Sequence, residues 1–148
     1  MPTVSAEVAI AAPVERVYAL ARDIEAFPDF MEDVQEVTIL EQTADRQVSR
    51  WVGVIREFNR TITWTEEDFW DDEQHTCFFR QTEGDFTSYE GTWTFRPDDG
   101  GTLARLEVTY EYRVPLVGAL IQGLLQKKVQ RNCQSMLEAI KAKAEAAG

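Results

Sequence analysis

The chain has 148 residues, of which 44% are hydrophobic and 28% charged, with a formal net charge of −11 and a pI near 4.5. This length and composition suit one globular domain, residues 1–148, rather than a disordered chain. The excess of negative charge disfavours binding to nucleic acid or to an anionic membrane surface.

The cysteines and the apolar runs bear on the cellular setting. Cys77 and Cys133 lie far apart in the sequence, which does not suit a disulfide framework or a CxxC motif. The first residues lack the basic and apolar regions of a signal peptide, and Lys127, Lys128 and Arg131 interrupt the longest apolar run. We therefore expect a cytoplasmic protein with no integral membrane association.

The beginning of the chain predicts a strand followed by a short helix. Apolar side chains alternate with others over residues 3–11, which is the period of a strand. Pro13 stands where helices often begin, and apolar residues with helical spacing follow it to Ile24. Phe27-Pro28 ends that helix, because the residue before a proline avoids the helical conformation.

Six further strands are predicted before residue 113, joined by turns rich in Gly, Asp, Asn and Pro. Short connections at 58–59 and 84–85 are typical of β-hairpins, so the strands should be antiparallel. The predicted ranges are 34–40, 48–55, 61–70, 75–82, 87–95 and 103–112.

A long amphipathic helix is predicted from Pro115 to about Ile140, followed by a fraying end over residues 142–148. Its apolar residues have the spacing of one buried helix face. They are Val117, Leu120, Ile121, Leu124, Leu125, Val129, Cys133, Met136, Leu137 and Ile140. The order of strand, helix, strands and long helix predicts an α+β domain whose sheet wraps around the last helix.

Alternation within the strands predicts an aromatic wall that faces this helix. If 58–59 is a two-residue turn, Trp51 pairs with Glu66; if 84–85 is one, Arg80 pairs with Tyr89 and also points inward. A slip of one residue would reverse each assignment. The predicted ligand-facing set is Trp51, Trp64, Glu66, Arg80, Tyr89, Trp93, Tyr110 and Tyr112, with Leu120 and Leu124 from the helix.

These side chains either fill a core or line a wet cavity. Aromatic residues at period two are core residues more often than ligand contacts. Several members of the set, however, carry hydroxyl or charged groups that need partners when they are buried. Gly53 and Gly91 on the same wall also leave space, so a cavity is the favoured interpretation.

Two apolar segments are candidates for a gate into such a cavity. The first is the connecting segment after the short helix, where Phe27, Phe30 and Met31 stand although polar residues are usual there. The second is the glycine-containing start of the long helix, around Val117. The alternative is that Phe27 and Phe30 plug the core beneath the first helix.

Few residues suit catalysis or metal binding. His75 is the only histidine and lies in an acidic turn, and we find no zinc-ligand spacing, phosphate loop or nucleophile elbow. We therefore expect no cofactor and no metal. Glu66 and Arg80, with inward tyrosines as proton donors, are the candidates for chemistry, because an apolar cavity raises the pKa of a carboxyl group.

Several motifs resemble those of a known superfamily. Residues 12–18 (Ala-Pro-Val-Glu-Arg-Val-Tyr) with Phe27-Pro28 resemble its opening motif, and residues 91–95 (Gly-Thr-Trp-Thr-Phe), with Gly100-Gly101-Thr102 and the long helix, resemble its second half. This is the START-like, helix-grip (SRPBCC) superfamily, in its polyketide cyclase/dehydrase and coenzyme-Q-binding branch. The resemblance implies a curved antiparallel sheet of about seven strands that grips the C-terminal helix around a deep apolar cavity.

The resemblance also implies binding of a lipid, quinone, polyketide or other bulky apolar molecule, while fold alone does not decide which. We favour an apolar small-molecule binding protein. The first alternative is a cyclase or dehydratase that uses the inward Glu, Arg and Tyr side chains. The second is a protein-interaction module, whose partner the sequence does not identify.

Overall fold

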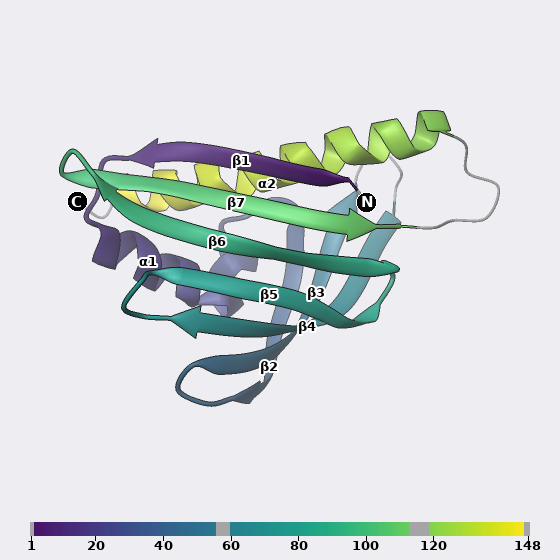
Figure 1. The fold of residues 1–148 in the computed structure, drawn as a ribbon, viewed down its shortest axis with the longest axis horizontal. Helices are drawn as coiled ribbons and strands as arrows, with labels where there is room; N and C mark the ends of the chain where they lie inside the picture. Colours follow the sequence, from purple (N-terminus) through teal and green to yellow (C-terminus); the bar gives the residue numbers. More distant parts are fainter. Residues whose placement is uncertain (1, 56–59, 113–118, 147–148) are drawn as a thin grey trace.

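A computed structural model of the protein describes residues 2–55, 60–112 and 119–146, and only the backbone of Ile55 and of residues 119–121. A seven-stranded antiparallel sheet curves around one long helix, which confirms the predicted helix-grip fold (Figure 1). The strands are β1 (Thr3–Ile10), β2 (Val34–Gln42), β3 (Arg46–Ile55), β4 (Arg60–Asp71), β5 (Thr76–Gly84), β6 (Ser88–Asp98) and β7 (Gly101–Glu111). The helices are α1 (Val14–Arg22), the 3₁₀ helix η1 (Ile24–Asp29) and α2 (Ala119–Ala146).

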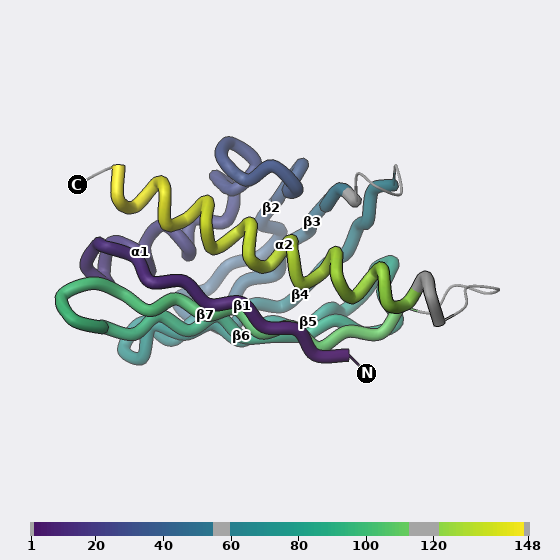
Figure 2. Tube along the Cα trace, turned by 90° about the horizontal axis from the view of Figure 1, so that it is seen from above, coloured from purple at the N-terminus to yellow at the C-terminus, as the bar shows by residue number. Residues whose placement is uncertain are grey.

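The sheet has the order β1-β7-β6-β5-β4-β3-β2, so the first strand closes one edge beside the last. Burial alternates residue by residue along β1 and β7, as expected for strands with one face on a core and the other toward solvent. Figure 2 shows α2 lying diagonally across the concave face, with β1 on one side and the curled β2–β3 side on the other.

Bulges help the sheet to curve. The β2–β3 pairing shifts register between Val34 and Glu36 and again between Ile39 and Glu41, and the β4–β5 pairing shifts between Thr65 and Glu66. An extra residue in one strand bends it and increases its twist. The third bulge lies beside Glu66, on the concave face, so it shapes the part of the sheet that faces α2.

The C-terminal half of α2 is tied firmly to β1 and to the segment that follows it. Glu145 accepts a hydrogen bond from the backbone N–H of Ala11 at 2.8 Å, and the Lys141 ammonium donates to the Ala9 carbonyl at 3.1 Å. Ala144 is fully buried. The prediction that the helix frays from residue 142 is therefore wrong, because the tertiary contacts with the first strand hold it as far as Ala146.

Candidate functional site

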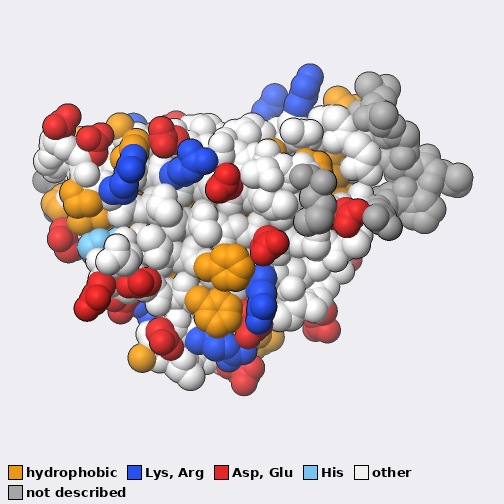
Figure 3. All heavy atoms as spheres, in the orientation of Figure 1, with side chains coloured by type: hydrophobic (Ala, Val, Ile, Leu, Met, Phe, Trp, Pro, Cys, Tyr) orange, Lys and Arg blue, Asp and Glu red, His pale blue; other side chains and the backbone are white. Residues whose placement is uncertain are grey.

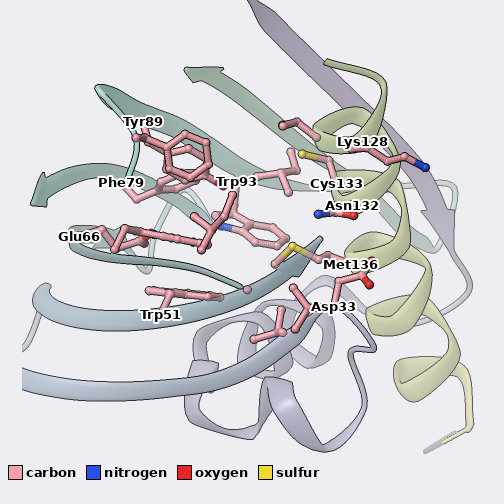
Figure 4. Close-up of a pocket in the computed structure, with 18 residues that line it drawn as sticks. Asp33, Trp51, Glu66, Phe79, Tyr89, Trp93, Lys128, Asn132, Cys133 and Met136 are labelled. Carbon is pink, nitrogen blue, oxygen red and sulfur yellow. The ribbon is translucent and has the colours of Figure 1, made fainter. Parts of the chain in front are cut away.

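A cavity lies between the concave face of the sheet and α2 (Figure 4). Its volume of about 80 Å³ has room for roughly six waters, or for one or two fused rings. The sheet supplies most of its wall and α2 closes it. The lining residues are Asp33, Val34, Trp51, Gly53, Val54, Ile62, Trp64, Glu66, Phe79, Phe86, Tyr89, Trp93, Leu106, Lys128, Val129, Asn132, Cys133 and Met136.

Stacked aromatic rings form the sheet side of the cavity. Trp51 and Trp64 pair directly across β3 and β4, and their rings stack with centroids 5.8 Å apart and planes 6° from parallel. The Tyr89 ring lies 5.1 Å from Trp64 and 5.7 Å from Phe79. The observed β3–β4 register differs from the predicted one by two residues, so Trp64 and Glu66 keep their predicted inward direction.

Two buried carboxyl groups stand side by side on the inner face of β4. Glu66 is 4% exposed and Asp68 is 2% exposed, and their side chains are hydrogen-bonded to each other. Glu66 Oε1 also accepts the Trp64 Nε1–H at 2.7 Å, while Asp68 Oδ2 accepts the Ser49 hydroxyl at 2.6 Å. Ser49 in turn accepts the Trp51 Nε1–H at 2.9 Å. The stacked tryptophans therefore also hold the polar network in place.

Burial has the largest influence on the pKa values of Glu66 and Asp68. Loss of water raises the pKa of Glu66 well above its usual range, and the neighbouring Asp68 charge raises it further. The pKa of Asp68 is raised by burial as well, although its hydrogen bonds to Glu66 and Ser49 oppose this. Burial therefore favours the neutral form of both carboxyl groups, most strongly that of Glu66. The titratable groups nearest to the pair are Cys77 on β5 and Tyr89 on β6, while Cys133 and Lys128 on α2 and Asp33 before β2 line the cavity.

The thiols and the phenol around the pair stay in their neutral forms near neutral pH. Burial raises the pKa of the Cys133 thiol to about 12, and that of Cys77 further still. Burial, the Cys133 thiol and the Glu66 carboxyl raise the pKa of Tyr89 well above its usual range. These three side chains therefore add no negative charge to the pair.

A second polar group lies at the helix side of the cavity, opposite Glu66 in Figure 4. With its amide oriented to satisfy both neighbours, Asn132 donates to Asp33 Oδ2 at 3.0 Å and to the Lys128 carbonyl at 3.3 Å. The cavity is therefore apolar along its length and polar at two ends.

Arg80 is a correction to the predicted site. It pairs with Glu90 rather than with Tyr89, and its side chain is 56% exposed on the outer face of the sheet. There it donates to Glu67 at 3.0 Å and covers the Phe69 ring, beside the exposed Phe78. Figure 3 shows this apolar patch with basic and acidic side chains around it over β4 and β5.

The other predicted residues divide between cavity and core. Trp51, Trp64, Glu66, Tyr89 and Trp93 line the cavity, whereas Tyr110, Tyr112 and Leu124 do not. Tyr110 is fully buried, and Tyr110 and Tyr112 both lie against the Phe86 ring, at 6.2 and 5.7 Å. Leu124 is 38% exposed. The side chain of Leu120 lies outside the described residues.

The described residues of the predicted gate pack into the core or against the end of α2. Phe27 is fully buried and packs edge-on against Trp51 at 5.8 Å, and Met31 is 3% exposed. Phe30 lies under Lys143, at 4.8 Å from its ring centroid, near the end of α2. At 1.5 Å per helical residue, this is roughly 35 Å from Ala119, so Phe30 does not meet the start of the helix. Phe27 and Met31 are therefore core residues, and the half-buried Phe30 packs against Phe27 and Lys143. Val117 lies outside the described residues, so its part in a gate stays a prediction.

Several lining residues were missed in the sequence. Phe79 lines the cavity because the β5 register is one residue from that predicted. Its ring also fills the space above Gly91, where an added Cβ would stand 2.7 Å from Phe79 Cζ, so Gly91 does not leave the wall open as predicted. The alternation of side chains along β4 could also have predicted that Asp68 faces inward, since it lies two residues beyond Glu66 on the same face.

The described residues hold no group of three or more side chains suited to a metal ion. Among the same residues, no helix has the length and apolar character needed to cross a membrane.

Comparison with known proteins assigns the family. The family model described as polyketide cyclase/dehydrase and lipid transport matches residues 1–145. The structure of TTHA0849 from Thermus thermophilus is similar with 40% identity and a TM-score of 0.94, over 99% of each chain. The Zhui aromatase/cyclase from Streptomyces sp. R1128 shares 23% identity, with a TM-score of 0.86 over 99% of this chain and 98% of that one.

A STAR-related lipid transfer protein from Xanthomonas axonopodis has the same fold at 17% identity, with a TM-score of 0.75 over 95% of this chain and 84% of that one. A search of the curated proteins found no match. From its sequence match over residues 1–145 and its helix-grip structure, this chain is a member of the polyketide cyclase/dehydrase and lipid transport family of the START-like superfamily.

Proposed function

We propose that the protein binds an apolar, ring-containing small molecule in the cavity between the sheet and α2. The observation that carries the proposal is the pair of stacked rings, Trp51 on Trp64, which lines the cavity. Aromatic stacks of this kind match flat ligands in shape and in polarity. The family description, with its polyketide and lipid ligands, supports the same class.

The cavity volume sets the size of ligand that enters without rearrangement. About 80 Å³ suits one or two rings, and burying such a molecule is favourable by roughly 25 cal/mol for each Å² of apolar surface, before the entropy cost of binding. A larger quinone, lipid or polyketide requires that α2 or the β2–β3 side move outward.

A cytoplasmic setting is part of this proposal, supported by Cys77 and Cys133, both buried and unpaired.

Tryptophan fluorescence tests the proposal, because Trp51, Trp64 and Trp93 all line the cavity. Titration with 1,4-naphthoquinone and 2-methoxynaphthalene should change the emission of the folded protein and saturate at one ligand per chain. A cavity-filling variant, Val129→Phe, should abolish the response. Leu124→Phe adds the same ring on the same helix, but outside the cavity, and should leave binding unchanged. An absence of saturable binding by either ligand would remove the proposal.

A cyclase or dehydratase activity is the second candidate, favoured by the acid pair at the cavity wall. Burial raises the pKa of Glu66 at the cavity wall and Tyr89 lines the same cavity, whereas Arg80 plays no part because it faces outward. For an enzyme of this kind, Glu66→Gln should abolish turnover of a poly-β-ketone substrate and leave naphthoquinone binding within about twofold of wild type. Unchanged turnover would exclude Glu66 as the acid.

A further inference from the structure

The buried carboxyl groups of Glu66 and Asp68 influence which ligands the cavity accepts. This inference rests on the proposed binding function. Among the described residues that line the cavity from the sheet side, Glu66 is the only one with a carboxyl group, and it is almost completely buried. In Figure 4 it lies at the end of the cavity away from Asn132 and Lys128. A ligand that fills the space between these ends places one edge against the Glu66 carboxyl.

The polar hydrogens of the network are already used. The Trp64 N–H is donated to Glu66, the Ser49 O–H to Asp68, and the Trp51 N–H to Ser49. The Glu66 and Asp68 side chains are hydrogen-bonded to each other. Four donors are thus satisfied within the protein, and what the pair presents to the cavity is the remaining lone pairs of the Glu66 oxygens.

We propose that Glu66 acts as a hydrogen-bond acceptor that selects neutral ring compounds bearing a hydroxyl group. A ligand O–H donates to a remaining lone pair of the Glu66 carboxyl, whereas an ether or a bare ring at the same place adds no hydrogen bond and covers that lone pair. An anionic ligand is rejected for a second reason. A carboxylate brought against the buried Glu66 carboxyl meets acceptor oxygens rather than a positive charge, and it loses its own hydration in a cavity lined mainly by apolar side chains.

Three probes on one ring system separate these effects: 2-naphthol, 2-methoxynaphthalene and 2-naphthoate. At neutral pH the first offers a donor, the second only an acceptor, and the third a negative charge. For the wild-type chain we expect 2-naphthol to bind about tenfold more tightly than 2-methoxynaphthalene, the worth of one hydrogen bond. We expect 2-naphthoate to bind more weakly than both.

Amino-acid substitutions test which side chain causes the preference for 2-naphthol over 2-methoxynaphthalene. Glu66→Met keeps the size of the side chain without its oxygens, and should bring 2-naphthol and 2-methoxynaphthalene to within about twofold of each other. Glu67→Gln is the matched control, since Glu67 is the next residue of β4 but faces outward, and it should retain the preference. Tyr89→Phe should also retain it. A preference lost in Tyr89→Phe and kept in Glu66→Met would assign the selection to the tyrosine and overturn the proposal.

The outcomes distinguish this inference from the function on which it rests. Equal binding of all three probes would overturn the selection by Glu66 while leaving the cavity a binding site. If none of the three probes binds, both the selection by Glu66 and the proposed binding function are wrong. If Glu66→Met does not fold, the order of the three probes on the unmodified chain still decides, because a preference for the ether or the carboxylate contradicts the acceptor role.

Discussion

Glu66 and Glu67 are neighbours on β4, yet the two faces of the sheet give them opposite properties. Glu66 faces the cavity, where burial beside Asp68 raises its pKa well above the usual range. Glu67 faces outward between Arg46 and Arg80, at 2.6 and 3.0 Å, and these hydrogen bonds hold its pKa below the usual range. One step along a strand thus exchanges a buried acid for a surface carboxylate, because successive side chains point to opposite faces.

Phe78 and Phe79 on β5 show the same contrast between the outer and inner faces of the sheet. Substitution of Phe79 should have the largest effect on the free energy of unfolding. Phe79 faces the cavity at 3% exposure, whereas Phe78 is 39% exposed and stacks on Phe69. Phe79→Ala should lower the free energy of unfolding by about 3 kcal/mol, and Phe78→Ala by about 1 kcal/mol or less. Urea denaturation followed by circular dichroism measures both. Equal losses would mean that the inner face is not the more tightly packed one.

Glu66→Gln tests the proton on the inner face. Glutamine has the shape and hydrogen bonds of a protonated glutamic acid, so it should preserve the contacts with Trp64 and Asp68. Because the pKa of Glu66 is raised on folding, folding takes up a proton above the ordinary glutamate pKa of 4.5. Wild-type stability should therefore fall relative to the variant as pH rises above that value, by at most about 1.4 kcal/mol for each pH unit.

Thermal unfolding of the two chains from pH 4 to pH 8 measures the difference. The melting temperatures should converge near the acid end, where Glu66 is protonated in the folded and unfolded chains alike. Parallel curves over the whole range would show that folding does not raise the pKa of Glu66.

Glu67→Gln should have the smallest effect, with the opposite dependence on pH. The lowered pKa of Glu67 means that its ion pairs stabilise the protein above pH 4.5, and that this contribution is lost as the pH falls. The variant should be slightly less stable than wild type at pH 7, and the gap should close in acid or in about 1 M salt, which screens exposed charges. A melting-temperature difference that survives both conditions would point to lost packing instead.

The sequence predicted most of the fold because its signals are local. Alternation over β1, β6 and β7 and the helical spacing before Ile140 lie within single elements, so each could be interpreted without knowing its partner. The inward direction of Trp51, Trp64 and Glu66 followed from the same alternation. It survived a register error of two residues because two is the side-chain period of a strand.

Pairing between strands was decided only by the tertiary structure, and the error over Arg80 shows why. A two-residue turn at 84–85 predicts that Arg80 pairs with Tyr89, but the connection is one residue longer and Arg80 pairs with Glu90. That single residue turns Phe79 into the cavity and Arg80 out to Glu67. The bulge beside Glu66, its contact with Asp68 and the plugging of the core by Phe27 likewise depend on distant packing, which no local pattern encodes. The sequence by itself thus determined the helix-grip architecture, through local periodicity, whereas the tertiary structure determined which side chains meet at the cavity, because register depends on turn length and on packing between segments distant in the chain.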